Sequence, residues 1–276
     1  MHNLESLLPL AVEKKASDLL LTVGVPPILR VKGEMLPVTG PALSGEETKK
    51  LLYAILRQDQ VARFERDREL DFSFTFKDRY RFRANAFFQR GAVGAVFRLV
   101  PVEIPAFETL GLPPVLTELA LRPQGLLLVT GPTGHGKSTT QAALIDRINR
   151  ERRAHIVTIE DPIEFIHANR KSVIEQRELG DDTLSFAAAV KHALRQAPDV
   201  LLVGEMRDTE TMAATLTAAE TGHLVVSTLH TNDSPGAIDR IIDSFPAHQQ
   251  NQVRSQLSMC LLAAIAQRLV PRADGQ

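Results

Sequence analysis

Residues 131–139 read Gly131-Pro132-Thr133-Gly134-His135-Gly136-Lys137-Ser138-Thr139, a run that fits the phosphate-binding pattern G-x-x-x-x-G-K-[ST]. The glycines let the backbone bend tightly and turn successive N–H groups toward an anion. In such loops the lysine reaches the outer phosphates of a nucleoside triphosphate, and the next hydroxyl binds Mg²⁺. The pattern therefore predicts a triphosphate site on this run and a Mg²⁺ contact at Ser138.

The segments on either side of the run support this interpretation. Gly125–Thr130 is a short apolar segment typical of a buried strand, and residues 138–150 carry apolar side chains at helical spacing. Strand, loop and helix in this order form the setting that a phosphate loop requires. The alternative is a glycine-rich turn with a coincidental lysine, but such a turn does not explain why a strand precedes the run and a helix follows it.

Composition limits the class of protein. With 276 residues and 44% apolar side chains, the chain can form one large domain or two ordinary ones. A formal net charge of −1 provides no basic field that would attract nucleic acid or anionic lipid. The single cysteine, Cys260, excludes an internal disulfide and a multi-cysteine zinc site. Because no apolar run approaches the roughly 20 residues of a membrane span and no signal peptide is recognisable, we expect a soluble cytoplasmic protein.

Residues 1–100 are predicted to form an α+β domain. A capping box at residues 44–47 starts a helix, and from Leu70 the hydrophobic period changes to two. Three alternating runs, separated by turn signals at Lys77-Asp78 and Gly91, predict an antiparallel meander with one buried face. Residues 101–114, which contain two prolines near their start, are predicted to be a linker.

Residues 115–276 are predicted to form an α/β domain, because strand and helix patterns alternate there. Strands are expected at 125–130, 155–160, 200–204 and 223–229. Helices are expected at 115–121, 137–150, 185–196, 208–221 and 247–263. The alternation implies a mainly parallel sheet with helices on both faces and a ligand site at the carboxyl ends of its strands.

Polar residues follow three of these strands at that edge. Glu160 belongs to an acidic group that can hold hydrated Mg²⁺ or orient a water, and a solvated strand exit explains the group equally well. Glu205 follows four apolar residues, which is the form of a second Mg²⁺-binding strand, and it can bind the metal or polarise the attacking water. His230 can sense the γ-phosphate or serve a structural role. Either carboxylate can act as the base.

Arginines gather on two neighbouring strands of the first domain. Arg79, Arg81 and Arg83 project from one face at period two, and Arg98 is a neighbour in the next strand. Like charges at this spacing repel each other unless an anion meets them, so a phosphate or an acidic partner surface is expected there. The alternative is a solvated polar face, which suits Arg79.

Four segments resemble the sequence boxes of the secretion ATPases. They are the phosphate loop at 131–139, Ile159-Glu-Asp-Pro-Ile-Glu-Phe165, Leu202-Val-Gly-Glu-Met-Arg-Asp208 and Gly222-His-Leu-Val-Val-Ser-Thr-Leu-His-Thr231. Ala16-Ser-Asp-Leu19 and Arg81-Phe-Arg-Ala-Asn-Ala86 are similar to the N-terminal domain of the PilT-like retraction ATPases of type IV pili. The likeness covers nearly the whole chain and implies a PAS-like α+β domain followed by a RecA-like P-loop ATPase domain.

The resemblance implies a hexameric Mg²⁺-dependent ATPase that couples ATP hydrolysis to pilus retraction and twitching motility. Its implied partners are further copies of itself, a paralogous motor and an inner-membrane pilus platform protein that keeps it peripheral to that membrane. The implied catalytic residues are Glu160, Glu205, His230, Arg81, Arg83 and Arg98, with the arginines as candidate arginine fingers. The implied ATP ligands are Gly131, Thr133, Gly134, His135, Gly136, Lys137, Ser138 and Thr139, and the implied Mg²⁺ ligands are Ser138 and Glu205.

The sequence departs from this family in two places. The family continues into a helical C-terminal region, which we expect to be absent because the sequence stops at Gln276. His135 stands where the family usually has serine, and nucleotide binding is expected to survive because the backbone forms the cradle. Two other functions stay open: a non-hydrolysing switch that assists an active motor, and a RecA-like nucleic-acid translocase, which the near-zero net charge disfavours.

Overall fold

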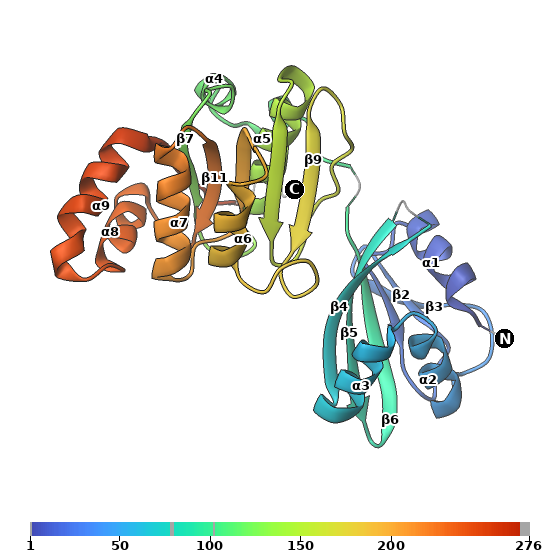
Figure 1. The fold of residues 1–276 in the computed structure, drawn as a ribbon. Coiled ribbons are helices and arrows are strands. Elements are labelled where there is room, and N and C mark those ends of the chain that lie inside the picture. The colour runs from blue at the N-terminus through green and yellow to red at the C-terminus, as the bar shows by residue number, and fades with distance from the viewer. Residues whose placement is uncertain (1, 78–79, 102, 271–276) are drawn as a thin grey trace. The chain divides into compact units, whose positions relative to one another are not determined.

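The computed structural model describes residues 2–77, 80–101 and 103–270. The chain separates into two compact units, Met1–Val102 and Glu103–Gln276, each with its own sheet and hydrophobic core (Figure 1). Among the described helices, none combines the length and the apolar character that crossing a bilayer requires.

The first unit is built on an antiparallel six-stranded sheet in the order β3-β2-β1-β6-β5-β4. The meander predicted from the period of two is present as β4-β5-β6, and the pairing of β1 with β6 adds three further strands. The elements are α1 (Leu4–Glu13), β1 (Asp18–Leu21), β2 (Ile28–Val31), β3 (Glu34–Pro37), α2 (Gly45–Tyr53), α3 (Gln58–Asp67), β4 (Glu69–Phe76), β5 (Tyr80–Gln89) and β6 (Ala92–Leu99).

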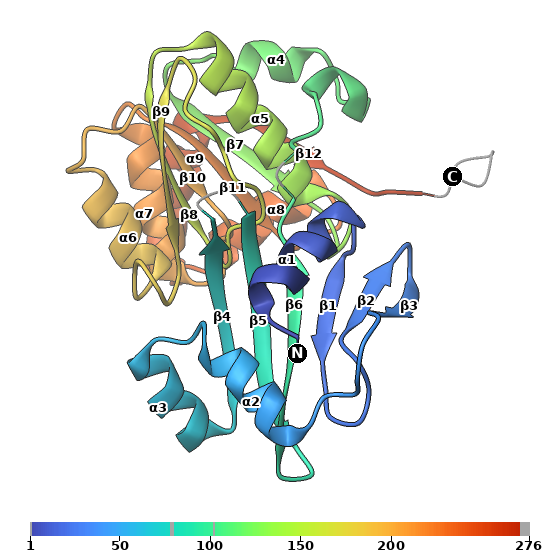
Figure 2. The same cartoon turned by 90° about the vertical axis from the view of Figure 1, so that its right-hand side faces the viewer.

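Helices cover one face of this sheet (Figure 2). Leu8 of α1, Leu52 of α2 and Phe64 of α3 are fully buried and belong to one core with Phe82 and Phe97 of the strands. Because side chains alternate along a strand, the residues between these apolar ones point to the opposite face. That second face carries the predicted arginines.

Two local predictions for the first unit can be compared with the structure. The capping box is present, since Ser44 Oγ accepts from Glu47 N and Glu47 Oε2 accepts from Ser44 N. Lys77 has a φ of 52°, a left-handed conformation that is common in turns. The other predicted turn residue, Asp78, and Arg79 lie outside the described residues.

The second unit contains a six-stranded sheet in the order β12-β7-β11-β10-β8-β9, and every neighbouring pair in it is parallel. The predicted order, an α+β unit followed by a parallel α/β unit, is confirmed. The elements are η1 (Phe107–Leu110), α4 (Val115–Ala120), β7 (Gly125–Thr130), α5 (Lys137–Glu151), β8 (His155–Glu160), β9 (Val173–Glu178), α6 (Phe186–Ala193), β10 (Val200–Val203), α7 (Thr209–Glu220), β11 (Leu224–Leu229), α8 (Ser234–Asp243), α9 (Ala247–Cys260) and β12 (Leu261–Ala266).

Two hydrophobic cores lie on opposite faces of the second sheet. On one face, α6, α7, α8 and α9 pack against side chains such as Leu201 and Val225. On the other face, η1, α4 and α5 pack against Leu202 and Val226. Strands β7, β10 and β11 are therefore buried along their whole length, which explains why their sequences are continuously apolar.

Several elements of the second unit differ from the expectation. The helix expected over 247–263 is wrong at its end, because α9 stops at Cys260 and Leu261–Ala266 forms β12 beside β7. A longer helix would pair the backbone groups of this apolar run with each other, whereas here β7 supplies their hydrogen-bond partners. The neighbouring strand therefore decides the conformation of Leu261–Ala266. The sequence does not predict α8, nor does it predict β9, an edge strand of mixed polar and apolar residues.

Candidate active site

The phosphate loop connects the buried strand β7 to helix α5. Its glycines take the conformations that the sequence pattern requires, with φ values of 145° at Gly131, 81° at Gly134 and 82° at Gly136. Gly136 occupies the N-cap position of α5 and offers no side chain to the first turn of the helix. The N–H groups of that turn and the positive end of the helix dipole are therefore available to an anion.

Lys137 is buried at the start of α5, with 8% of its surface exposed. Its Nζ donates hydrogen bonds to the carbonyl oxygens of Gly131 at 2.8 Å and Pro132 at 2.9 Å. Burial lowers the pKa of Lys137, and the nearby carboxylate of Glu205 acts in the opposite direction. Ser138 is exposed beside it, so its hydroxyl is accessible to a ligand.

Neighbouring strands bring Glu205 and His230 together. Glu205 lies just beyond β10, and His230 follows β11, which pairs with β10 in parallel. The Nε2 of His230 lies 3.2 Å from one carboxylate oxygen of Glu205, and Arg207 forms an ion pair with the other oxygen at 2.5 Å. Glu205 is only 8% exposed. Its contacts with His230 and Arg207 hold the carboxylate in place.

Glu160 lies at the end of β8 and has different partners. Its carboxylate accepts hydrogen bonds from Thr158 Oγ1 at 2.7 Å, Gln176 Nε2 at 3.1 Å and the N–H of Glu164 at 3.3 Å. Burial raises the pKa of Glu160, although these three donors act in the opposite direction. A general base works best when its pKa lies near the working pH, so a raised pKa suits a carboxyl group to act as a base near neutral pH.

Gly204 allows the two acidic segments to approach each other. A Cβ at this position would lie 3.2 Å from the carbonyl oxygen of Ile159 and 3.4 Å from the Cα of Glu160. The first contact is tighter than most real Cβ contacts, so the neighbouring backbone would have to shift to admit a side chain. The absence of a side chain at Gly204 therefore places β10 and the residues after it close to Glu160.

The three described candidate arginines lie on the polar face of the first unit's sheet. Arg83 in β5 is the register partner of Arg98 in β6, and Arg98 is in turn the partner of Asp18 in β1. Arg98 Nε donates to Asp18 at 2.9 Å, and Arg81 donates to the hydroxyls of Ser73 and Thr75. Asp18 is not among the predicted site residues; it is buried, and its carboxylate also lies 3.5 Å from Arg30 Nε.

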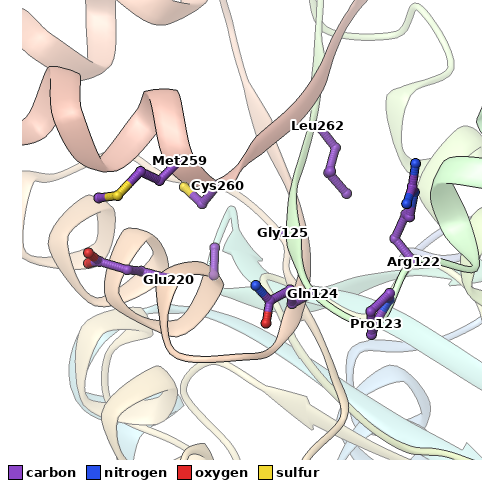
Figure 3. A pocket seen from close by; sticks show the side chains of 9 residues that line it. Arg122, Pro123, Gln124, Gly125, Glu220, Met259, Cys260 and Leu262 are labelled. Atoms are coloured by element: carbon purple, nitrogen blue, oxygen red, sulfur yellow. The ribbon is translucent and has the colours of Figure 1, made fainter.

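A pocket on the second unit lies away from these residues (Figure 3). Its lining includes Arg122, Gly125, Glu220 and Cys260, which stand at or before the amino end of β7 and at the ends of α7 and α9. The phosphate loop follows the carboxyl end of β7. The pocket therefore belongs to the opposite edge of the sheet and is separate from the candidate active site.

Comparisons with known proteins give the family. Residues 62–276 match the family of Type II/IV secretion system proteins. The chain is 46% identical over 273 residues to the type IV pilus retractation ATPase PilT of Pseudomonas aeruginosa, a match that covers 99% of this chain and 79% of PilT. It is also 46% identical over 272 residues to the type IV pilus ATPase PilU of that organism, covering 99% of this chain and 71% of PilU.

The comparison of folds indicates the same family as the comparison of sequences. A crystal structure of the pilus retraction motor PilT with bound ADP matches this structure with a TM-score of 0.94 and 49% sequence identity, covering 100% of this chain and 80% of that one. The chain therefore belongs to the Type II/IV secretion system protein family, and within it to the PilT- and PilU-like pilus ATPases.

Proposed function

We propose that this chain is the motor subunit of a hexameric ring that couples ATP hydrolysis to type IV pilus retraction, and so to twitching motility. The support is its likeness to PilT over 99% of its length. We further propose that the ring works on the cytoplasmic side of the inner membrane, where it binds a pilus platform protein and does not bind nucleic acid. A paralogous motor would be an additional partner.

The phosphate loop and the acidic edge of the sheet supply the groups that phosphoryl transfer needs. Lys137 would bring positive charge to the β- and γ-phosphates, and the loop N–H groups would hold their oxygens. Ser138 and Glu205 would hold Mg²⁺, which neutralises charge on the phosphates when it is bound. Mg²⁺ is usually held by one or two protein oxygens together with the phosphates of the nucleotide, so two protein ligands would be enough.

The contrast between the two carboxylates carries the proposal. Glu205 is ion-paired with Arg207 and contacts His230, whereas Glu160 is held by neutral donors and has a raised pKa caused by burial. Because the two carboxylates have different hydrogen-bond and ion-pair partners, they suit different roles in the reaction. We propose that Glu160 takes the proton of the attacking water and that Glu205 holds the metal.

Two further roles complete the proposal. His230 would respond to the γ-phosphate through its contact with Glu205, because a shift of the Glu205 carboxylate would alter its hydrogen bond with the imidazole. Arg81, Arg83 and Arg98 would act as arginine fingers, which stabilise the charge that develops during phosphoryl transfer. Asp18 would hold the guanidinium of Arg98 in a fixed direction.

The likeness to PilU gives a second candidate, because its identity to this chain equals that of PilT at 46%. In this reading the chain is an accessory pilus motor that acts beside a second ATPase. Deleting the gene and scoring surface pili and twitching separates the two readings. Loss of twitching with pili retained supports a retraction motor, and wild-type twitching supports an accessory role.

Phosphate release tests the enzymatic part of the proposal. Purified protein should release phosphate from millimolar Mg-ATP, and chelating the metal should stop the release. The matched control is Lys137→Ala, which removes the ammonium group and leaves the loop backbone. Release that continues at the wild-type rate in this variant would place the chemistry elsewhere, and no release from the wild type would favour a non-hydrolysing switch.

A further inference from the structure

The residues that follow β12 lie against the phosphate loop. Ala266, the last residue of β12, pairs with Thr130, and the N–H of Gln267 donates to the carbonyl of Thr130 at 2.8 Å. Figure 2 shows the chain in red as it leaves β12. Thr130 immediately precedes the loop, so the segment Gln267–Leu269, which we call the loop strap, begins where the loop begins.

Gln267 contacts both ends of the phosphate loop. A Cβ on Gly131 would lie 2.2 Å from the carbonyl oxygen of Gln267, so the loop strap leaves no space for a side chain there. A Cβ on Gly136 would lie 2.8 Å from Gln267 Nε2. The Gln267 side chain also accepts a hydrogen bond from Thr140 Oγ1 at 2.7 Å. Thr140 lies in the first turn of α5 and is 1% exposed, so one glutamine joins the start of the loop, its end and the helix behind it.

The middle of the loop is tied to the strap as well. His135 Nδ1 accepts a hydrogen bond from the N–H of Leu269 at 3.0 Å. To accept this bond, Nδ1 must carry a lone pair and no proton. The contact is made by His135, the loop residue at which the sequence departs from the family pattern. The loop strap is therefore joined to the loop at three points along its length.

Nucleotide binding would act on the same atoms. Lys137 Nζ donates to the carbonyls of Gly131 and Pro132, and Gly131 is the residue whose Cα abuts Gln267. A triphosphate attracts this ammonium, which takes a donor away from the Gly131 carbonyl beside the strap. The carbonyl oxygen of Gln267 lies directly beside Gly131, so a shift of the Gly131 backbone toward it would displace the strap.

We propose that Gln267 is a positioning residue of the nucleotide site. It holds the phosphate loop in its binding form through Thr130 and Thr140, and it makes the loop strap respond to a bound nucleotide. The inference rests on the proposed nucleotide site and adds to it a residue, 127 positions from Thr140, that acts through the phosphate loop and the first turn of α5.

Binding of ADP tests the positioning role without any turnover. Gln267→Ala removes the side chain, and Thr140→Val removes only the hydroxyl that donates to it. Loss of this partly buried hydrogen bond should weaken ADP binding by about tenfold in Gln267→Ala. Both variants break the same hydrogen bond between Thr140 and Gln267. The double variant should therefore bind ADP no more weakly than Gln267→Ala alone.

Gln256→Ala is the matched control. Gln256 in α9 also makes a side-chain hydrogen bond, to Glu220 at the opposite edge of the sheet, so its loss should leave ADP affinity unchanged. Calorimetric titration measures the affinities, and thermal unfolding shows that each variant is folded. Wild-type affinity in both Gln267→Ala and Thr140→Val would overturn this inference alone. A wild-type protein that binds no ADP would overturn the proposed nucleotide site together with it.

Hydrogen exchange tests the response of the strap. In the wild type, ADP should change the exchange of the Gln267 and Leu269 amides, which donate to Thr130 and His135. Gln267→Ala should remove most of this difference, and His135→Ala should speed exchange at Leu269 while leaving the Gln267 amide protected. Exchange in the strap that is identical with and without ADP would contradict the proposed response.

Discussion

Replacing Gln176 with leucine should shift the pH dependence of ATP hydrolysis. Gln176 Nε2 donates to Glu160 at 3.1 Å and to the carbonyl of Phe165 at 2.8 Å, and its Oε1 accepts from the N–H of His167 at 2.8 Å. The first of these bonds stabilises the charged form of Glu160. Its loss therefore raises the pKa of Glu160 beyond the effect of burial, and a larger fraction of the base is protonated at a given pH.

The structure sets the size of the effect. A hydrogen bond to a charged group contributes about 1.5–3 kcal/mol, and a length of 3.1 Å favours the lower end. Since about 1.4 kcal/mol is a factor of ten in a proton equilibrium, kcat on the acidic limb should fall about tenfold. The plateau at higher pH should change little, because the deprotonated base is restored there. The acidic limb therefore moves to higher pH.

Steady-state phosphate release from pH 5 to pH 9 measures this shift, with Gln256→Leu as the control for a glutamine remote from the site. Losing the bonds to Phe165 and His167 should also destabilise the fold by about 1–3 kcal/mol, so the assay needs a temperature at which unfolding scans show native protein. An unshifted acidic limb in folded Gln176→Leu would refute the assignment of Glu160 as the base.

Three other changes test separate parts of the account. Lys137→Ala should lower kcat at saturating Mg-ATP by roughly a hundredfold or more, because it removes the charge aimed at the transferred phosphate, and a loss of only a few-fold in phosphate release would contradict this. The double variant Arg81→Ala/Arg83→Ala should lose about 10³ in kcat while ATP affinity from equilibrium titration stays within about tenfold, and wild-type turnover would exclude these residues as arginine fingers. Burial lowers the pKa of His167 from 6.5 to about 4, so between these values the unfolded chain binds a proton that the native imidazole does not. The free energy of unfolding should therefore fall by up to about 3 kcal/mol as the pH drops through that range, and urea titrations of His167→Gln should show a weaker dependence.

The second unit was largely predictable, because its signals are local. The pattern of Lys137 and the loop glycines fixes a strand before it and a helix after it, and both are present. The carboxyl ends of parallel strands meet at one edge, so Glu205 and His230, 25 residues apart, could be expected together. The end of α9 was not predictable, since only the neighbouring strand β7 makes Leu261–Ala266 extended.

The residues that contact the proposed site residues could not be found from the sequence. Asp18 meets Arg98 across 80 residues, and Gln267 meets Thr140 across 127. Gln176 lies on β9, an edge strand that hydrophobic periodicity does not reveal. Each of these side chains is an ordinary polar residue in the sequence, and its role depends on a partner that only the folded chain brings within hydrogen-bond distance.

Single-turnover hydrolysis of bound ATP in Glu160→Gln and Glu205→Gln tests the central claim most directly. Both substitutions keep nearly the same size and remove one negative charge. If Glu160 is the base and Glu205 holds the metal, Glu160→Gln should bind Mg-ATP with nearly wild-type affinity and retain it as ATP. Glu205→Gln should instead need more Mg²⁺ to reach its maximal rate. Rapid conversion of bound ATP to ADP by Glu160→Gln would contradict the account.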